Sequence, residues 1–114
     1  MLTAIYKICG RQDWSRAVTD GVYTGSPDDR RDGYIHFSTA AQLAGTLAKH
    51  FRGRDDLLLL AVEIASVSPT LKWERARGGQ LFPHLYGTLD VTLVTGARPL
   101  ELGLDGRHIL PRGL

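Results

Sequence analysis

The stretch Leu57-Leu58-Leu59-Leu60-Ala61-Val62-Glu63-Ile64 is the strongest β-strand signal in the chain. A strand with one face in water alternates apolar and polar residues, whereas this run is apolar at every position except Glu63. Such a run is typical of a strand that is covered on both faces. Because the run is far shorter than a membrane-spanning helix, the sequence also predicts no membrane partner.

A helix is predicted upstream of this strand, from Ser38 and Thr39 through about Arg52, with Gly53 as its stop signal. Thr39 and Gln42 have the spacing of a capping box, and Ser38 is the other candidate N-cap. Apolar residues recur at helical spacing and predict a buried stripe that comprises Leu43, Ala44, Leu47, Ala48 and Phe51.

The N-terminal part of the chain predicts a strand, a helix and a second, brief strand. Residues 3–9 favour a strand with Tyr6 on one face and Lys7 on the other. Residues 13–19 place apolar residues at helical spacing, and Gly21 is a plausible C-terminal stop. Residues 22–24 complete this part as a short strand.

Residues 25–32 predict a loop, because Ser26-Pro27 is followed by a run of Asp and Arg residues. Such a charge run is usually a solvated loop, and a mobile flap over a site is the alternative. Residues 33–37 predict a short strand that leads into the helix.

The chain after residue 64 predicts short strands and turns. The pattern predicts a loop or single turn at 66–69, a strand at 71–75, a Gly78-Gly79 turn and a tight turn at 83–87. A strand is also predicted at 91–95, and residues 98–102 either extend this strand or follow it. Two helices and at least five strands that do not strictly alternate predict an α+β fold with mainly antiparallel pairing. The length of 114 residues predicts a single domain, 1–114.

Composition narrows the partners and the compartment. The net charge of +2 is far from the footprint of a nucleic-acid-binding domain, so nucleic acid is not an expected partner. The single cysteine excludes an intrachain disulfide and fits a reducing compartment. Since the first residues lack the pattern of a signal peptide, the sequence predicts a cytoplasmic location and leaves the oligomeric state open.

The segment Gly33-Tyr34-Ile35-His36-Phe37-Ser38-Thr39 could form part of a binding or catalytic site. On a strand, Tyr34, His36 and, by period, Ser38 point to the same side. The predicted strand runs into a helix N-terminus, whose free N–H groups suit a phosphate or a carboxylate. The alternative is structural: Ser38 or Thr39 caps the helix, and His36 is a half-buried strand residue.

A second candidate segment contains Trp73-Glu74 and Phe82-Pro83-His84-Leu85-Tyr86-Gly87. Glu74 could hold a ribose hydroxyl or stabilise a cation, while His84 and Tyr86 could donate hydrogen bonds. The alternative is an aromatic corner that closes the core, with Glu74 exposed to solvent.

Neither a metal centre nor a cysteine nucleophile is predicted. The four histidines, His36, His50, His84 and His108, have no paired ligand spacing, and one cysteine cannot build a zinc knuckle. Cys9 lies on a strand that is expected to be buried, where a thiol is usually inert.

Together these segments resemble a bacterial family of domains of unknown function, number 952 in that series. The segments, in order, are Ile5-Tyr6-Lys7-Ile8, Gly33 through Thr39, Leu57 through Leu60, Trp73-Glu74 and Phe82 through Gly87. The resemblance covers residues 5 to about 99. That family is in turn remotely similar to the ADP-ribosyltransferase-like fold, which implies split antiparallel β-sheets, two or more flanking helices and a cleft between the sheets.

The resemblance also implies a substrate class and a set of site residues. Enzymes of that fold bind NAD or a related ADP-ribosyl compound, so NAD is a candidate substrate, and no other cofactor is implied. With the two candidate segments described above, the candidate catalytic residues are His36 and Glu74, and the candidate ligand-binding residues are Tyr6, Lys7, Tyr34, Ser38, Thr39, His84 and Tyr86. Many members of the family have His where this chain has Lys7, a residue suited to holding a phosphate.

Three functions follow from these observations as hypotheses. The first is an enzyme that acts on NAD, an ADP-ribosyl compound or a related nucleotide. The second is a module that binds a small nucleotide-like ligand without turnover, motivated by Lys7 in place of His. The third is a protein- or nucleic-acid-interaction domain that uses Arg30, Arg31, Arg52 and Arg54.

Overall fold

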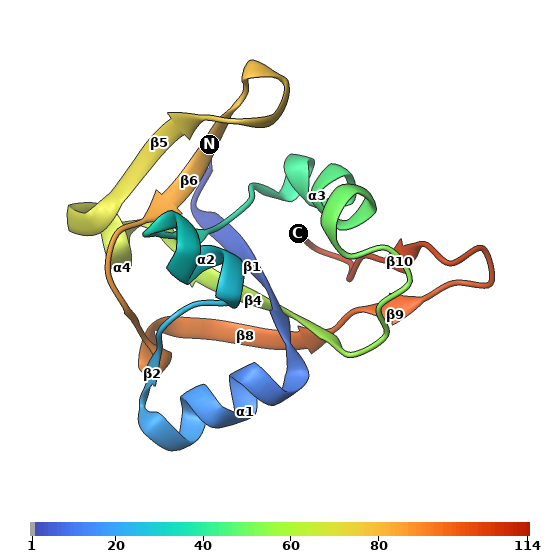
Figure 1. Ribbon diagram of the computed structural model, residues 1–114, viewed down its shortest axis with the longest axis horizontal. Helices are drawn as coiled ribbons and strands as arrows, with labels where there is room; N and C mark the ends of the chain where they lie inside the picture. Colours follow the sequence, from blue (N-terminus) through green and yellow to red (C-terminus); the bar gives the residue numbers. More distant parts are fainter. Residues whose placement is uncertain (1) are drawn as a thin grey trace.

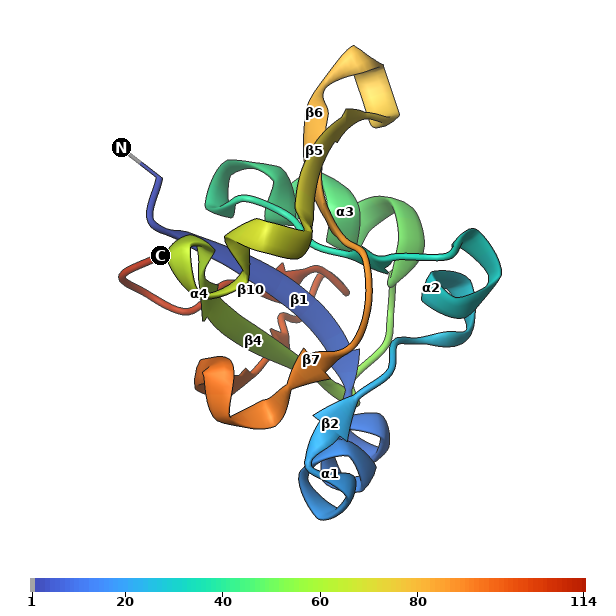
Figure 2. The same ribbon diagram turned by 90° about the vertical axis from the view of Figure 1, so that its left-hand side faces the viewer.

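The computed structural model describes residues 2–114 and has an α+β fold in which every strand pair is antiparallel (Figures 1 and 2). The strands are β1 (Ala4–Gly10), β2 (Val22–Tyr23), β3 (Ile35–His36), β4 (Leu57–Glu63), β5 (Leu71–Arg75), β6 (Leu81–Leu85), β7 (Leu89–Asp90), β8 (Val94–Pro99), β9 (Glu101–Leu102) and β10 (His108–Ile109). The α-helices are α1 (Arg11–Asp20), α2 (Pro27–Asp32), α3 (Leu43–His50) and α4 (Ile64–Val67), with short 3-10 turns at Ala40–Gln42, Ser68–Thr70, Arg77–Gly79 and Val91–Leu93. The α+β class and the antiparallel pairing that the sequence predicts are therefore confirmed.

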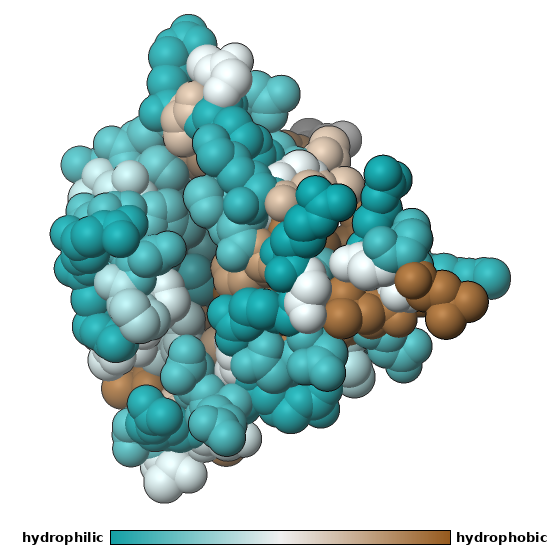
Figure 3. Space-filling model, turned by 45° about the vertical axis from the view of Figure 1, so that its right-hand side comes forward, coloured by the Kyte–Doolittle hydropathy of each residue, from teal (hydrophilic) through white to brown (hydrophobic). Residues whose placement is uncertain are grey.

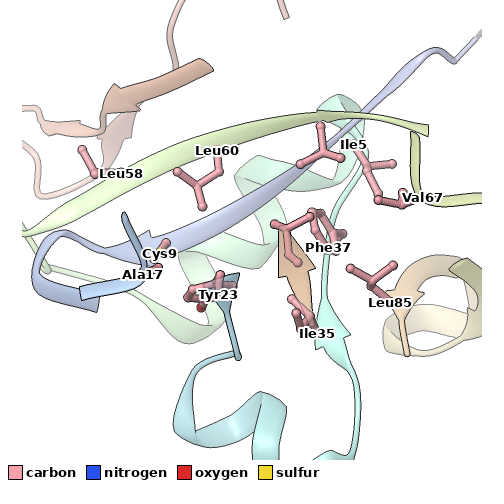
Figure 4. Close-up of a cluster of buried hydrophobic side chains, with 12 residues drawn as sticks. Ile5, Cys9, Ala17, Tyr23, Ile35, Phe37, Leu58, Leu60, Val67 and Leu85 are labelled. Carbon is pink, nitrogen blue, oxygen red and sulfur yellow. The ribbon is translucent and has the colours of Figure 1, made fainter. Parts of the chain in front are cut away.

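Strand β4 is the middle strand of a three-stranded sheet and lies between β1 and β8. Its successive residues contact two different hydrophobic clusters: Leu58 and Leu60 belong to one, and Leu57 and Leu59 to the other. Figure 4 shows the first cluster, which also includes Phe37, the residue that directly follows β3. The predicted strand is thus covered on both faces.

A second three-stranded sheet has the order β3-β6-β5 and carries both candidate histidines. In its register Ile35 pairs with Leu85, and His36 pairs with His84. Two backbone hydrogen bonds of 2.8 Å, between Tyr6 and Ser38 in both directions, connect this sheet to β1. Because of this bridge, the functional candidates of the first strand lie next to those that follow β3.

Residues 25–32 were expected to form a loop, but residues Pro27–Asp32 form the helix α2. The Oγ of Ser26 accepts the Asp29 N–H, and the Asp29 carboxylate accepts the Ser26 N–H, which together make a capping box. Pro27 at the first helical turn and Gly33 with φ +87° at the C-terminal end complete the helix signals. The loop prediction was wrong because the charge run concealed these signals.

The predicted helix from Ser38 to Arg52 is shorter in the structure. The Thr39 capping box with Gln42 is present, but the first turn is 3-10, and the α-helix α3 ends at His50. Of the predicted stripe, Leu43 and Leu47 are buried, whereas Ala44 and Ala48 are exposed. The buried face is narrower than predicted because α3 contacts the sheet with a single row of residues at i, i+4 spacing.

Two predictions in the C-terminal half also need correction. The expected tight turn at 83–87 is largely strand β6. Pro83 is tolerated in this strand because β3 ends beside it. The N–H group that Pro83 lacks therefore affects only the end of the β3–β6 pairing. The strand expected at 91–95 begins at Val94, because the Asp90 carboxylate accepts the Thr92 N–H at 2.9 Å and favours a 3-10 turn. The predicted strand at 71–75 and the Gly78-Gly79 turn are confirmed.

The C-terminal hairpin of β9 and β10 exposes apolar side chains, which appear as a brown area in the otherwise mainly hydrophilic view of Figure 3. Leu104 and Ile109 are exposed there. Neither residue lines the cavity that contains the candidate histidines.

Tyr23 offers a test of the main core. The residue is 2% exposed, and its hydroxyl has no hydrogen-bond partner among the described residues except for a contact with the Cys9 thiol, which is a weak acceptor. Since a buried hydroxyl without a strong partner is destabilising, Tyr23→Phe should raise the free energy of unfolding by about 1 kcal/mol. Urea unfolding measures this free energy, and a lower value in Tyr23→Phe than in the parent chain would contradict a Tyr23 hydroxyl that lacks a strong partner.

Candidate functional site

A cavity of about 290 Å³ lies beside the junction of β1 and the second sheet, with residues of α2 and α3 in its wall. Figure 1 shows α2 and α3 on either side of β1. Six of the residues singled out from the sequence line this cavity: Tyr6, Lys7, Tyr34, His36, Ser38 and His84. Thr39, Glu74 and Tyr86 are not part of its lining.

His36 on β3 lies between two carboxylates of α2. Its Nδ1 is 2.6 Å from Asp29 Oδ1, and its Nε2 is 3.0 Å from Asp32 Oδ2. Because ionised carboxylates only accept hydrogen bonds, both contacts are hydrogen bonds only when both ring nitrogens carry a proton. The surroundings of His36 therefore suit an imidazolium, which can donate a proton.

Asp29 organises this part of the site from a buried position. Its carboxylate is 2.8 Å from Lys7 Nζ and also accepts the backbone N–H groups of Ser26 and His36. Burial alone would raise the pKa of Asp29, but the His36 hydrogen bond and the Lys7 charge outweigh it and hold this pKa well below its usual range. Lys7 is thus engaged in an ion pair, so it is not a free cation for a phosphate.

Asp29 is the site residue that the sequence analysis missed. The charge run suggested a solvated side chain, whereas the structure buries it. The spacing of Ser26 and Asp29, with Pro27 between them, is a capping-box signal that could have identified the helix, though not the partners Lys7 and His36.

His84 on β6 has a carboxylate partner of its own. Its Nδ1 is 2.8 Å from Glu74 Oε1, the same oxygen that accepts the Tyr86 hydroxyl at 2.7 Å. These hydrogen bonds from Tyr86 and His84 lower the pKa of Glu74, and the bond to Glu74 raises the pKa of Tyr86 to about 12. Glu74 and Tyr86 therefore orient His84 and do not line the cavity themselves.

The contact with ionised Glu74 selects the nitrogen of His84 that donates. Nδ1 carries the proton that Glu74 accepts, so in the neutral tautomer of this ring Nε2 is the nitrogen that can accept a proton. This Nε2 has no hydrogen-bond partner within residues 2–114. The ring itself is held by stacking on Tyr34, with centroids 4.0 Å apart and planes inclined by 20°.

The two histidines form one cross-strand pair. His36 and His84 are opposite each other in the β3–β6 register, and their ring centroids are 5.6 Å apart. The two carboxylates around His36 suit a ring that donates protons, whereas the single carboxylate at His84 leaves its Nε2 available to accept a proton. Two titratable groups with such different surroundings can act as general acid and general base at one site.

The helix start at Ser38 and Thr39 provides less for an anion than the sequence suggests. The Ser38 N–H donates to the Tyr6 carbonyl at 2.8 Å, and the Thr39 N–H donates to Gln42 Oε1 at 3.0 Å. The Ser38 hydroxyl lies 3.1 Å from Thr46 Oγ1. Both backbone donors are therefore in use, and Thr39 acts as a helix cap.

Within residues 2–114, no helix is long and apolar enough to cross a membrane. The same part of the chain has no group of three or more His, Cys, Asp or Glu side chains arranged to hold a metal ion. Cys9 is buried, and burial raises the pKa of its thiol to about 11, so the thiol stays protonated at neutral pH.

Comparisons with known proteins identify relatives over nearly the whole chain. A model of the family described as protein of unknown function (DUF952) matches residues 8–97. A crystal structure of protein CC0527 from Caulobacter crescentus and one of its double mutant each have 47% sequence identity and a TM-score of 0.91, and they cover 95% of both chains. The solution NMR structure of the same protein has a TM-score of 0.84 and covers 93% of this chain and 91% of that one. No curated protein matches the chain.

Proposed function

For this chain, which belongs to the DUF952 family of proteins of unknown function, we propose an enzyme activity on an ADP-ribosyl compound or a related nucleotide, by general acid–base catalysis. The observation that carries the proposal is that His36 and His84, each with Nδ1 held by a carboxylate, line one cavity. Two antiparallel sheets joined at one bridge, with the cavity beside the junction, support an ADP-ribosyltransferase-like fold as part of this proposal.

The proposed reaction is hydrolysis or transfer at a glycosidic carbon. His84 Nε2 takes the proton of the attacking water or alcohol, whose oxygen forms the new bond to the ribose carbon. The bond to the leaving group breaks, and its electron pair goes with that group. Where the leaving atom needs a proton, His36 supplies it; nicotinamide leaves NAD as a neutral molecule and needs none.

A carboxylate at the cavity stabilises the positive charge that develops on the ribose in this step. The sequence suggested Glu74 for this role, but Glu74 does not line the cavity. Asp32 does line it, and its carboxylate contacts His36 Nε2. We therefore assign the charge-stabilising role to Asp32 and the positioning of His84 to Glu74.

The size of the cavity constrains how such a ligand binds. A volume of about 290 Å³ is at the lower end of small-molecule sites, which start at roughly 300 Å³. The cavity thus suits a ribosyl group and the ring attached to it, with Tyr34 as an aromatic wall. The phosphates of a larger ligand extend toward the cationic side chains in the rest of the lining.

The arginines of the interaction-domain hypothesis are mostly engaged with the protein itself. Arg30 donates to the Gly25 carbonyl, Arg31 contacts Asp28 and Asp32, and Arg54 contacts Asp56. The charges of Arg31 and Arg54 are therefore compensated by carboxylates, which weakens the positive field that nucleic-acid binding needs and favours a small-molecule ligand.

A ligand-binding module without turnover is the second candidate, favoured by one observation. Both ring nitrogens of His36 already have carboxylate partners, so proton transfer to a ligand requires Asp32 to give up its contact. A ligand that left this contact in place would be bound without reaction.

Incubation of the protein with NAD, ADP-ribose and nicotinamide mononucleotide, followed by chromatography of the products, tests the proposal. We expect breakdown of at least one compound, a loss of about 10²-fold or more in His84→Ala, and full activity in the control His108→Ala. His108 is a suitable control because it lies outside the cavity. Saturable binding without product would assign the second candidate, and neither binding nor product would contradict both.

A further inference from the structure

One face of α3 places three polar side chains on the wall of the cavity. Thr46, Lys49 and His50 have i, i+3 and i+4 spacing, which puts them on the same side of a helix. All three line the cavity. None of the roles assigned above uses them.

Arg77 joins this face from the turn between β5 and β6, the hairpin that projects in Figure 2. Its Nη1 donates to Thr46 Oγ1 at 3.3 Å, and its guanidinium lies over the Phe82 ring at 4.9 Å. The absence of a side chain at Gly45 leaves room, since a Cβ there would lie 2.9 Å from Arg77 Nη2. Arg77 is therefore held against α3, and it also lines the cavity.

The positive charge of this wall is not compensated. Lys49 and Arg77 form no salt bridge within residues 2–114, whereas Lys7 is paired with Asp29, and Arg31 with Asp28 and Asp32. Desolvation lowers the pKa of His50, the charges of Lys49 and Arg77 lower it further, and the charge of Asp28 opposes them. Lys49 and Arg77 thus place two cations without carboxylate partners near His50 on the wall of the cavity.

We infer that Lys49, His50 and Arg77 form an anion subsite that binds a phosphate or pyrophosphate group of the ligand, while Thr46 accepts a hydrogen bond from Arg77 and holds it in place. The planar guanidinium of Arg77 can donate two parallel hydrogen bonds to phosphate oxygens, and Lys49 adds a point charge. This inference rests on the proposed function for the rest of the ligand, whose ribosyl group would lie at His36 and His84. It replaces the helix start at Ser38 and Thr39 as the expected phosphate site.

The subsite defines a substrate class. A phosphate bound at α3 and a reacting atom at the histidines require a ligand that carries both on one ribose. Nucleotides and ADP-ribosyl compounds have this arrangement, and nucleosides do not. The chain should therefore discriminate between AMP and adenosine.

NMR titration of the full chain with pyrophosphate, AMP and adenosine tests the subsite. We expect pyrophosphate and AMP to shift the ring resonances of His50 saturably, and adenosine to bind at least about tenfold more weakly than AMP. Lys49→Ala and Arg77→Lys should each weaken pyrophosphate binding about tenfold. Arg52→Ala is the matched control, because it removes one positive charge outside this cavity and should leave the affinity unchanged.

Equal affinity for pyrophosphate in Lys49→Ala, Arg77→Lys and Arg52→Ala would overturn the subsite, as would an unmoved His50 resonance. Failure of the proposed function looks different. In that case the His50 shifts and the Lys49→Ala effect on pyrophosphate binding persist, while none of the tested compounds is broken down.

Discussion

Lys7→Met is expected to lower the free energy of unfolding by about 3–5 kcal/mol, because it leaves the Asp29 carboxylate buried without its cation. The exposed fractions of the two side chains are 5% for Lys7 and 2% for Asp29, and their charges are 2.8 Å apart. Two backbone N–H groups and His36 still contact Asp29 in the variant, which limits the loss. Urea unfolding at neutral pH measures the difference.

Arg31→Met is the matched control for this prediction. Arg31 also contacts aspartates, but its side chain is 68% exposed, so its removal should lower the free energy of unfolding far less than Lys7→Met does. Similar costs for Lys7→Met and Arg31→Met would contradict a buried ion pair at the centre of the site.

The same ion pair predicts how the free energy of unfolding depends on pH in the acid range. The pKa of Asp29 is lower in the folded chain than in the unfolded chain, where it is about 4. Its contribution is therefore fully present above about pH 4 and is lost as the pH falls from there toward the folded-state pKa. Asp29→Asn should remove this part of the acid dependence, and an unchanged acid slope would contradict it.

His84→Ala is expected to lower kcat about 10²–10⁴-fold on whichever ADP-ribosyl compound the chain breaks down, because it removes the proposed general base. The side chain is 5% exposed and stacked on Tyr34, so a circular-dichroism spectrum and an unfolding curve must accompany the kinetics. Full activity in a folded His84→Ala chain would exclude His84 as the base.

Glu74→Gln tests whether Glu74 acts through His84. Glu74 touches His84 but does not line the cavity, so the variant should lower kcat less than His84→Ala does. It should lower kcat and leave KM unchanged, because Glu74 lies outside the lining of the cavity and acts through the orientation of His84. Tyr86→Phe removes the other hydrogen bond to Glu74 but keeps the contact between Glu74 and His84, so it should lower kcat less than Glu74→Gln does.

The elements that local pattern determines could be predicted from the sequence. The continuous apolar run of β4 and the turn at Gly78-Gly79 depend on residues that are adjacent in the chain, and both are confirmed. Helix α2 also had a local signal, in the spacing of Ser26 and Asp29, which the surrounding charges obscured.

The parts of the site that depend on long-range pairing could not be predicted. His36 and His84 were candidates separately, but only the register of β3 with β6 brings them together. The burial of Asp29 depends on Lys7, which lies 22 positions away. For the same reason, the contact of Arg77 with α3 could not be predicted from the sequence.

An NMR titration of the chain with ADP-ribose tests the central claim most directly, with the amide and histidine ring resonances followed together. The account predicts saturable shifts at Tyr34, His36 and His84, on the wall of one cavity, and no shift at His108 outside it. The absence of shifts at His36 and His84 at millimolar ADP-ribose, or equal shifts at His108, would contradict the claim that this cavity binds a nucleotide-like ligand.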